Sequence, residues 1–128
     1  MGLDMYLKGV KYYWGFNGQR PKEDGFDVSG HTIELGYWRK HPDLHGYIVQ
    51  TFAEGKDECQ DIELCTDDLV KILAASEAGD LPHTEGFFFG ESDETDKPHT
   101  KTVLEGAIKW LEEKEDRVSR SVIYRASW

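Results

Sequence analysis

Residues 31–55 read HTIELGYWRKHPDLHGYIVQTFAEG, and this stretch holds a strand signal followed at once by a helix signal. From His31 to Trp38 apolar residues fall on alternate positions, which is typical of a half-buried strand. Pro42 then suits the first turn of a helix, because the N–H that proline lacks would have no partner there. Gly55 is placed to end that helix. The strand face is Ile33, Leu35 and Tyr37, and the helix stripe is Leu44, Tyr47, Ile48 and Phe52.

Similar patterns extend to both sides of this stretch and predict the other elements. A first strand covers Leu3 to Trp14, with Tyr6, Val10, Tyr12 and Trp14 on one parity, and the glycine-rich residues 15–30 form a long loop. Thr66 is the expected cap of a second helix that Gly79 ends. The remaining elements are a strand over 60–64, an irregular segment over 81–90, a helix from about Pro98 to Lys114, and a last strand over 119–128 with Val122, Tyr124 and Ala126 on one side.

These elements predict an α+β fold with a mostly antiparallel sheet of about four strands and about three helices on one face, in the order β-β-α-β-α-loop-α-β. A chain of 128 residues has the common size of one domain, so residues 1–128 are expected to share one core. The expected helix residues facing the sheet are Leu44, Ile48, Phe52, Leu69, Leu73, Leu104, Ile108 and Leu111.

The formal net charge of −10 argues against binding to duplex DNA or to an anionic membrane. An acidic chain can instead act as a DNA mimic, but that requires regularly spaced acids, and the one dense cluster is Glu91 to Asp96. The sequence has no stretch of about 20 apolar residues and no secretion signal at its start, which predicts a cytosolic protein. Cys59 and Cys65 are accordingly expected to be reduced and buried.

The best candidate site is Gly36-Tyr37-Trp38-Arg39-Lys40-His41, where the second strand leads into the first helix. A helix N-terminus attracts anions, and arginine can grip a phosphate or carboxylate through two parallel hydrogen bonds. Two aromatic rings beside these bases could stack on a nucleobase. The alternative is that Trp38 belongs to the core and that the two bases are simply solvated. The candidate ligand-binding residues are Tyr37, Trp38, Arg39, Lys40, His41, His45 and Phe88.

Other motifs give little support for catalysis or for a cofactor. His41 and His45 have the spacing of metal ligands, but no third ligand stands near them in the sequence, so no metal is expected. The Gly86-Phe87-Phe88-Phe89-Gly90 segment lacks the lysine and the spacing of a phosphate loop, although one of its rings could line a pocket. No nucleophile motif is present, which leaves enzymatic activity open but disfavoured.

Taken together, several segments resemble a family of small, uncharacterised proteins of tailed phages and prophages. The matching segments are GLDMYL at 2–7, GYWRK at 36–40 with His45, Leu81-Pro82, GFFFG at 86–90, and Tyr124 with Ser127-Trp128. The chain departs from the family pattern at His41-Pro42-Asp43 and over 91–99. The resemblance implies a phage accessory protein in the host cytosol, and such proteins commonly blunt host defence.

Three functions from different classes follow. The first is a binding protein that sequesters a nucleotide-like anionic ligand to counter host defence signalling. The second is an acidic inhibitor of a host nuclease or nucleic-acid-binding complex. The third is a small nucleotide-processing enzyme, for which His41, His45 and Asp4 are the candidate acid–base groups. Partners are therefore a small molecule or a host defence protein, without nucleic acid or membrane, and the protein is expected to form a homo-oligomer.

Overall fold

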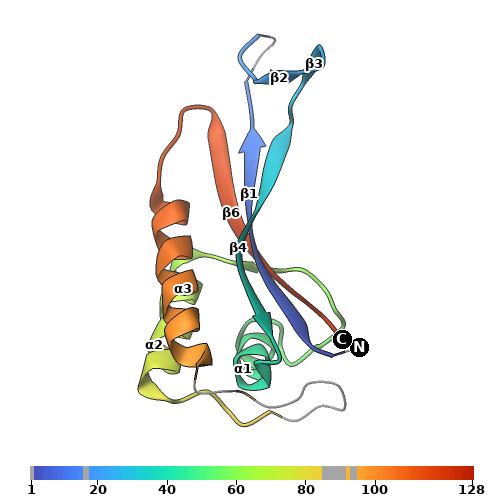
Figure 1. Ribbon diagram of the computed structural model, residues 1–128. Helices are drawn as coiled ribbons and strands as arrows, with labels where there is room; N and C mark the ends of the chain where they lie inside the picture. Colours follow the sequence, from blue (N-terminus) through green and yellow to red (C-terminus); the bar gives the residue numbers. More distant parts are fainter. Residues whose placement is uncertain (1, 16–17, 85–91, 93–94) are drawn as a thin grey trace.

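The computed structural model describes residues 2–15, 18–84, 92 and 95–128, which form an α+β fold (Figure 1). The main sheet has four strands in the order β4-β1-β6-β5, and all of its pairs are antiparallel. These strands are β1 (Asp4–Tyr13), β4 (Gly30–Arg39), β5 (Ile62–Leu64) and β6 (Val118–Ser127). The helices are α1 (Pro42–Phe52), α2 (Thr66–Ala78) and α3 (Asp96–Glu112), so the predicted fold class and element order are confirmed.

A small hairpin stands beyond one end of the main sheet (Figure 1). It consists of β2 (Lys22–Glu23) and β3 (Phe26–Asp27), within the stretch predicted to be a loop. Asp27 holds the hairpin together, because its carboxylate binds the guanidinium of Arg20 at 3.1 Å and the ammonium of Lys22 at 2.5 Å. We call this end, with the adjoining ends of β1 and β6, the tip.

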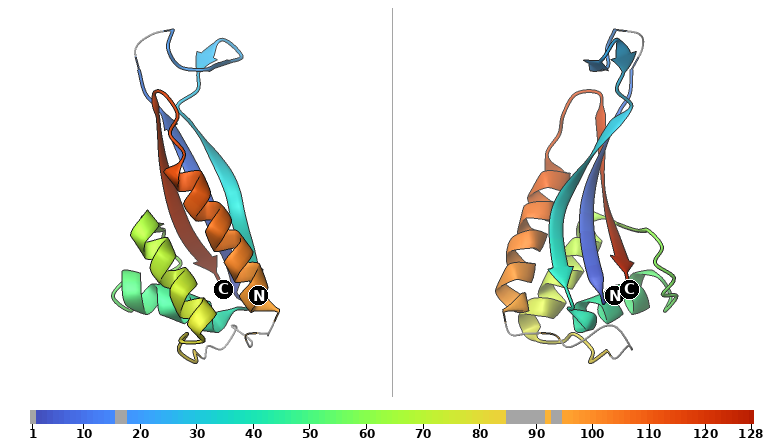
Figure 2. Two further views of the ribbon diagram at one scale, coloured as in Figure 1. Left: turned by 90° about the vertical axis from the view of Figure 1, so that its left-hand side faces the viewer. Right: turned by 45° about the vertical axis from the view of Figure 1, so that its right-hand side comes forward.

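Helices α2 and α3 pack against each other on one face of the sheet (Figure 2). Leu3, Met5 and Leu7 of the β1 segment are buried toward this helical layer. A Cβ at Gly9 would lie 2.8 Å from the Trp110 ring, so glycine lets the α3 indole rest directly on the sheet. Of the predicted core residues, Leu44, Ile48, Leu69 and Leu104 are buried, whereas Phe52, Leu73, Ile108 and Leu111 are partly buried against the core.

The opposite face of the sheet carries the alternate residues of each strand. Tyr6, Val10 and Tyr12 share one face of β1, as the sequence predicted, and this is the face away from α3. Tyr12 and Trp14 are 55% and 49% exposed. The last strand follows its predicted alternation, with Val122, Tyr124 and Ala126 buried.

A bulge in β4 changes the predicted pattern of that strand. Gly36 pairs with Leu7 and Glu34 pairs with Lys8, which leaves Leu35 as an extra residue. Directly opposed residues of antiparallel strands share a face. Ile33, opposite Gly9, is therefore on the helical face, while Tyr37, opposite Tyr6, is on the other. The prediction that Ile33 and Tyr37 share a face was wrong, because alternation cannot reveal a bulge.

One of the two glycines predicted to end a helix does so: α1 ends at Phe52 with Ala53 as its C-cap, so Gly55 lies beyond its end. Gly79 has φ 72° and ends α2, as predicted. The N-cap of α2 is Cys65, so the prediction of Thr66 as the cap was wrong. The backbone N–H of Cys65 donates to the Asp68 carboxylate at 3.0 Å. Helix α3 begins at Asp96, two residues before Pro98. Both cysteines are free, but Cys65 is exposed and Cys59 half-buried, so the prediction of buried thiols was wrong. Within the described residues, none of the helices has the length and apolar character needed to cross a membrane.

Candidate functional site

The predicted site at the β4–α1 junction contains three exposed side chains and a carboxylate. The Tyr37 hydroxyl donates a hydrogen bond to the Asp4 carboxylate, and this bond, with burial, raises the pKa of Tyr37. The same carboxylate lies 3.9 Å from the guanidinium of Arg39, whose side chain is 58% exposed. Lys40 is also exposed, at φ 58°, and its backbone N–H donates to the Leu3 carbonyl at 2.9 Å. Tyr37, Arg39 and Lys40 thus remain accessible, but Asp4 offsets part of their positive charge.

Trp38 is not part of this exposed surface. Its side chain points to the helical face, only 3% of it is exposed, and its indole N–H donates to the Thr100 hydroxyl of α3 at 2.9 Å. A ring packed in this way cannot stack on a ligand without unpacking α3 from the sheet. The assignment of Trp38 as a ligand contact is therefore corrected, and the alternative placement in the core is what the structure has.

His41 is buried at the start of α1 and interacts with groups of the same chain. Its Nδ1 lies 2.8 Å from the Ser92 hydroxyl and 3.8 Å from the Asp96 carboxylate. Burial lowers the pKa of His41, against the opposing effect of Asp96. The first free backbone N–H of the helix, on Asp43, donates to the same Ser92 hydroxyl at 3.2 Å. Asp43 also places a carboxylate in the first turn, so protein groups already occupy part of the predicted anion site.

His45 belongs to a separate buried network. Its Nδ1 is 2.6 Å from the Tyr124 hydroxyl and its Nε2 is 2.9 Å from the Asp57 carboxylate. Burial raises the pKa of Tyr124 well above its ordinary value, which keeps the phenol neutral. The network joins α1, β6 and the α1–β5 loop, and with 2% of His45 exposed it is closed to a ligand. His45 is therefore a core residue rather than the ligand contact that the sequence suggested.

The two histidines also do not converge on a metal. Each binds its own protein partners, and among the described residues no group of three or more His, Cys, Asp or Glu side chains could hold an ion. Phe88, the last predicted contact, lies outside the described residues.

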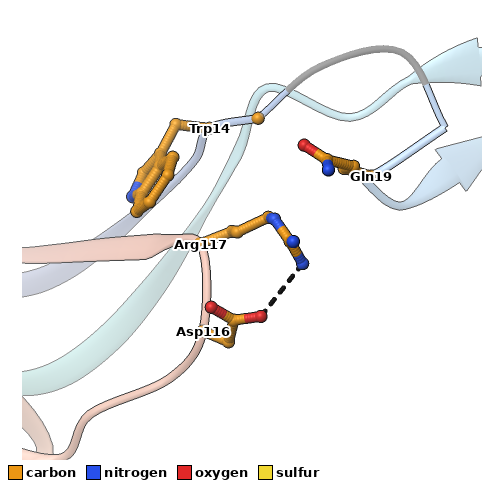
Figure 3. Close-up of a pocket in the computed structure, with 5 residues that line it drawn as sticks. Trp14, Gln19, Asp116 and Arg117 are labelled. Atoms are coloured by element: carbon orange, nitrogen blue, oxygen red, sulfur yellow. Dashed lines mark hydrogen bonds and ion pairs between the residues drawn. The ribbon is translucent and has the colours of Figure 1, made fainter.

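A pocket of about 470 Å³ opens at the tip, and the sequence did not single it out (Figure 3). Small-molecule pockets commonly have volumes of about 300–1,000 Å³, so this one is large enough for a nucleotide-sized ligand. Its walls come from the β1–β2 connection, which starts directly after β1, and from the α3–β6 turn. They are formed by Trp14, Gly15, Gln19, Asp116 and Arg117.

The chemistry of this pocket combines a flat apolar ring with hydrogen-bonding groups. The backbone N–H of Trp14 donates to the Arg117 carbonyl at 3.0 Å, which fixes the two sides of the pocket to each other. The Arg117 guanidinium binds the neighbouring Asp116 carboxylate at 3.0 Å, and these side chains are 42% and 84% exposed. An ion pair this exposed contributes little, so the guanidinium can turn to an anionic ligand at small cost. Gly15 and Arg117 have φ of 136° and 58°, so both stand in the left-handed region.

Sequence reasoning missed these residues because they come from opposite ends of the chain. Trp14 was assigned to a strand end, and Asp116 and Arg117 lie a hundred residues later. The one available signal was the long glycine-rich loop after Trp14, since such loops are often functional.

No protein-family model, curated protein or solved structure matches the chain.

Proposed function

We propose that this protein is a non-catalytic binding protein that sequesters a small nucleotide-like ligand in the tip pocket. The observation that carries the proposal is the pocket itself, in which an exposed indole and a guanidinium border one cavity of about 470 Å³. The Trp14 ring is suited to stack on a nucleobase. Arg117 can bind a phosphate through two parallel hydrogen bonds, and Gln19 supplies a carboxamide to the same walls.

Sequestration is favoured over catalysis by the state of the candidate acid–base groups. His41 and His45 are 4% and 2% exposed, and both are engaged with neighbouring side chains. Asp4, the third candidate, accepts from Tyr37 on the far end of the sheet from the tip. None of the three borders the pocket. Given the resemblance to phage accessory proteins, the proposed setting is the host cytosol and the proposed purpose is removal of a defence signal.

The proposal is tested by incubating the purified protein with a cellular nucleotide extract, followed by washing, denaturation and mass spectrometry of the released small molecules. We expect a nucleotide to be released unchanged. A chemically altered nucleotide would favour the enzyme, and release of no small molecule would reject sequestration.

Two arginine variants locate the site. We expect Arg117→Glu to weaken binding of the recovered nucleotide by about 1–3 kcal/mol, the usual contribution of a charge-assisted hydrogen bond, while Arg39→Glu binds as the wild type does. Trp14→Ala should also weaken binding, by about 1–3 kcal/mol of lost stacking. The opposite ranking of the two arginine variants in calorimetric titrations would place the site at the β4–α1 junction instead.

A second candidate function, the acidic inhibitor, is favoured by one concentration of charge. Residues 54–68 contain seven acids and a single lysine, on the α1–β5 loop, β5 and the start of α2. Such a surface attracts basic proteins over long distances. This function would be supported if the protein retained a host nuclease in a salt-sensitive manner. Replacing Glu54, Glu58 and Glu63 by glutamine should then abolish the retention.

A further inference from the structure

We propose that the face of the sheet opposite the helices, called here the open face, is where two copies of this protein associate through a twofold axis. The open face consists of the residues that alternate with the buried ones on β1, β4 and β6. Its members, paired across the strands, are Tyr6, Lys8, Val10 and Tyr12 of β1, Thr32, Glu34, Tyr37 and Arg39 of β4, and Ser119, Ser121, Ile123 and Arg125 of β6.

The centre of the open face is apolar and aromatic. The Tyr6 and Tyr37 rings lie 5.3 Å apart, and the Lys8 ammonium lies 5.7 Å from the Tyr6 ring. Val10 and Ile123 are only half-buried, although they stand on two inner strands of the sheet. Tyrosine and arginine are enriched in protein interfaces, where one ring supplies both apolar area and a hydrogen-bonding group.

The charge of the open face differs from that of the whole chain. It carries three bases, Lys8, Arg39 and Arg125, and, with Asp4 at the start of β1 included, two acids, Asp4 and Glu34. The open face is thus close to neutral, and the acidic excess that gives the chain its net charge of −10 lies on the remaining surface.

The charges of the open face indicate which kind of partner binds there. A nucleic-acid strand is repelled by the chain as a whole and would meet carboxylates among the bases of this face. A basic protein would be drawn more strongly to residues 54–68. A second copy is repelled by the acidic surfaces and meets least repulsion at the balanced face, where a twofold axis brings identical tyrosines together.

The size of the face is compatible with such an interface. Three strands of 10 residues each, at ~3.3 Å per residue and ~4.8 Å between strands, cover a flat area of roughly 500 Å². The accessible surface of the side chains that project from this area exceeds the flat area, and a standard interface buries ~800 Å² of accessible surface per partner. Sheets that stack face to face in this way are a common arrangement.

The test compares two valine-to-glutamate variants of the full chain by sedimentation equilibrium over a micromolar to hundred-micromolar range. Val10→Glu puts a charge at the centre of the open face, and the twofold axis would bring two of these charges together. Val70→Glu is the matched control, since Val70 is a 49% exposed valine on α2. We expect the wild type and Val70→Glu to form dimers of two 14.7 kDa chains, and Val10→Glu to raise the dimer Kd at least about tenfold.

Circular dichroism establishes that each variant is folded, and Ser121→Arg, at the position paired with Val10, replaces Val10→Glu if that variant does not fold. A monomeric wild type at the highest concentration would overturn the proposal, and so would a Val10→Glu dimer as stable as that of Val70→Glu. Because neither valine borders the tip pocket, nucleotide retention by the monomeric variant would leave the proposed function intact.

Discussion

At the scale of single residues, His45 shows how a polar group is accommodated in this core. Both of its ring nitrogens have a partner, Tyr124 at 2.6 Å and Asp57 at 2.9 Å. Tyr124→Phe would leave one nitrogen without its hydroxyl, and an unsatisfied buried group costs about 1–3 kcal/mol. We expect a loss of that size in urea unfolding. Tyr12→Phe is the matched control because Tyr12 is 55% exposed, and equal effects of the two changes would contradict the network's role.

His41 gives a second residue-scale prediction, on pH. Its pKa is lowered in the folded protein by burial, so the unfolded chain takes up the proton first as the pH falls. The free energy of unfolding should therefore decrease as the pH falls through the ordinary histidine pKa of about 6.5. His41→Gln should remove part of this decrease in thermal unfolding. A steeper pH dependence in the variant would mean that Asp96 dominates instead.

At the scale of elements, the contact between β4 and α3 depends on a residue without a side chain. A Cβ at Gly36 would lie 2.2 Å from Cγ1 of Val103, whereas a Cβ at Gly106 would meet no atom within 4 Å. Gly36→Ala must push α3 from the sheet and should cost about 1–3 kcal/mol, as overpacking does. Gly106→Ala, in the interior of α3, should instead stabilise by about 0.5–1 kcal/mol through helix propensity. Chemical denaturation measures both, and a shared sign would refute this account of the contact.

The same contact explains what the sequence could and could not predict. Local periodicity was sufficient for β6, whose buried residues alternate without interruption, and for the end of α2 at Gly79. It left Trp38 undecided between a ligand site beside Arg39 and Lys40 and the core, because the partner of the indole is Thr100, some sixty residues later. For this reason, the residues predicted to form one site are separated in the structure into an exposed group and a core group. The tip pocket likewise joins Trp14 to Arg117, and no local pattern records that proximity.

At the scale of the whole molecule, the fold has a strongly paired body and a weakly paired tip. Strand β1 pairs along its length with both β4 and β6, while β2 and β3 share only two residue pairs (Figure 1). Local opening requires less free energy where few contacts are lost. Backbone amides of β1 should therefore exchange with deuterium only on global unfolding, and those of 22–27 should exchange much earlier.

Hydrogen exchange then distinguishes the two proposals, because each predicts protection in a different place. A nucleotide bound between Trp14 and Arg117 should slow exchange at the C-terminal end of β1, at the N-terminal end of β6 and in residues 18–27. The reason is that the bound ligand links segments that open separately without it. The Arg117→Glu variant should lose this added protection under the same nucleotide concentration. Self-association should instead slow exchange at the open face as the protein concentration rises. The Arg117→Glu variant should keep this dependence on concentration, and the Val10→Glu variant should lose it. Nucleotide-dependent protection confined to residues 36–43 would contradict the tip assignment and return the ligand to the β4–α1 junction.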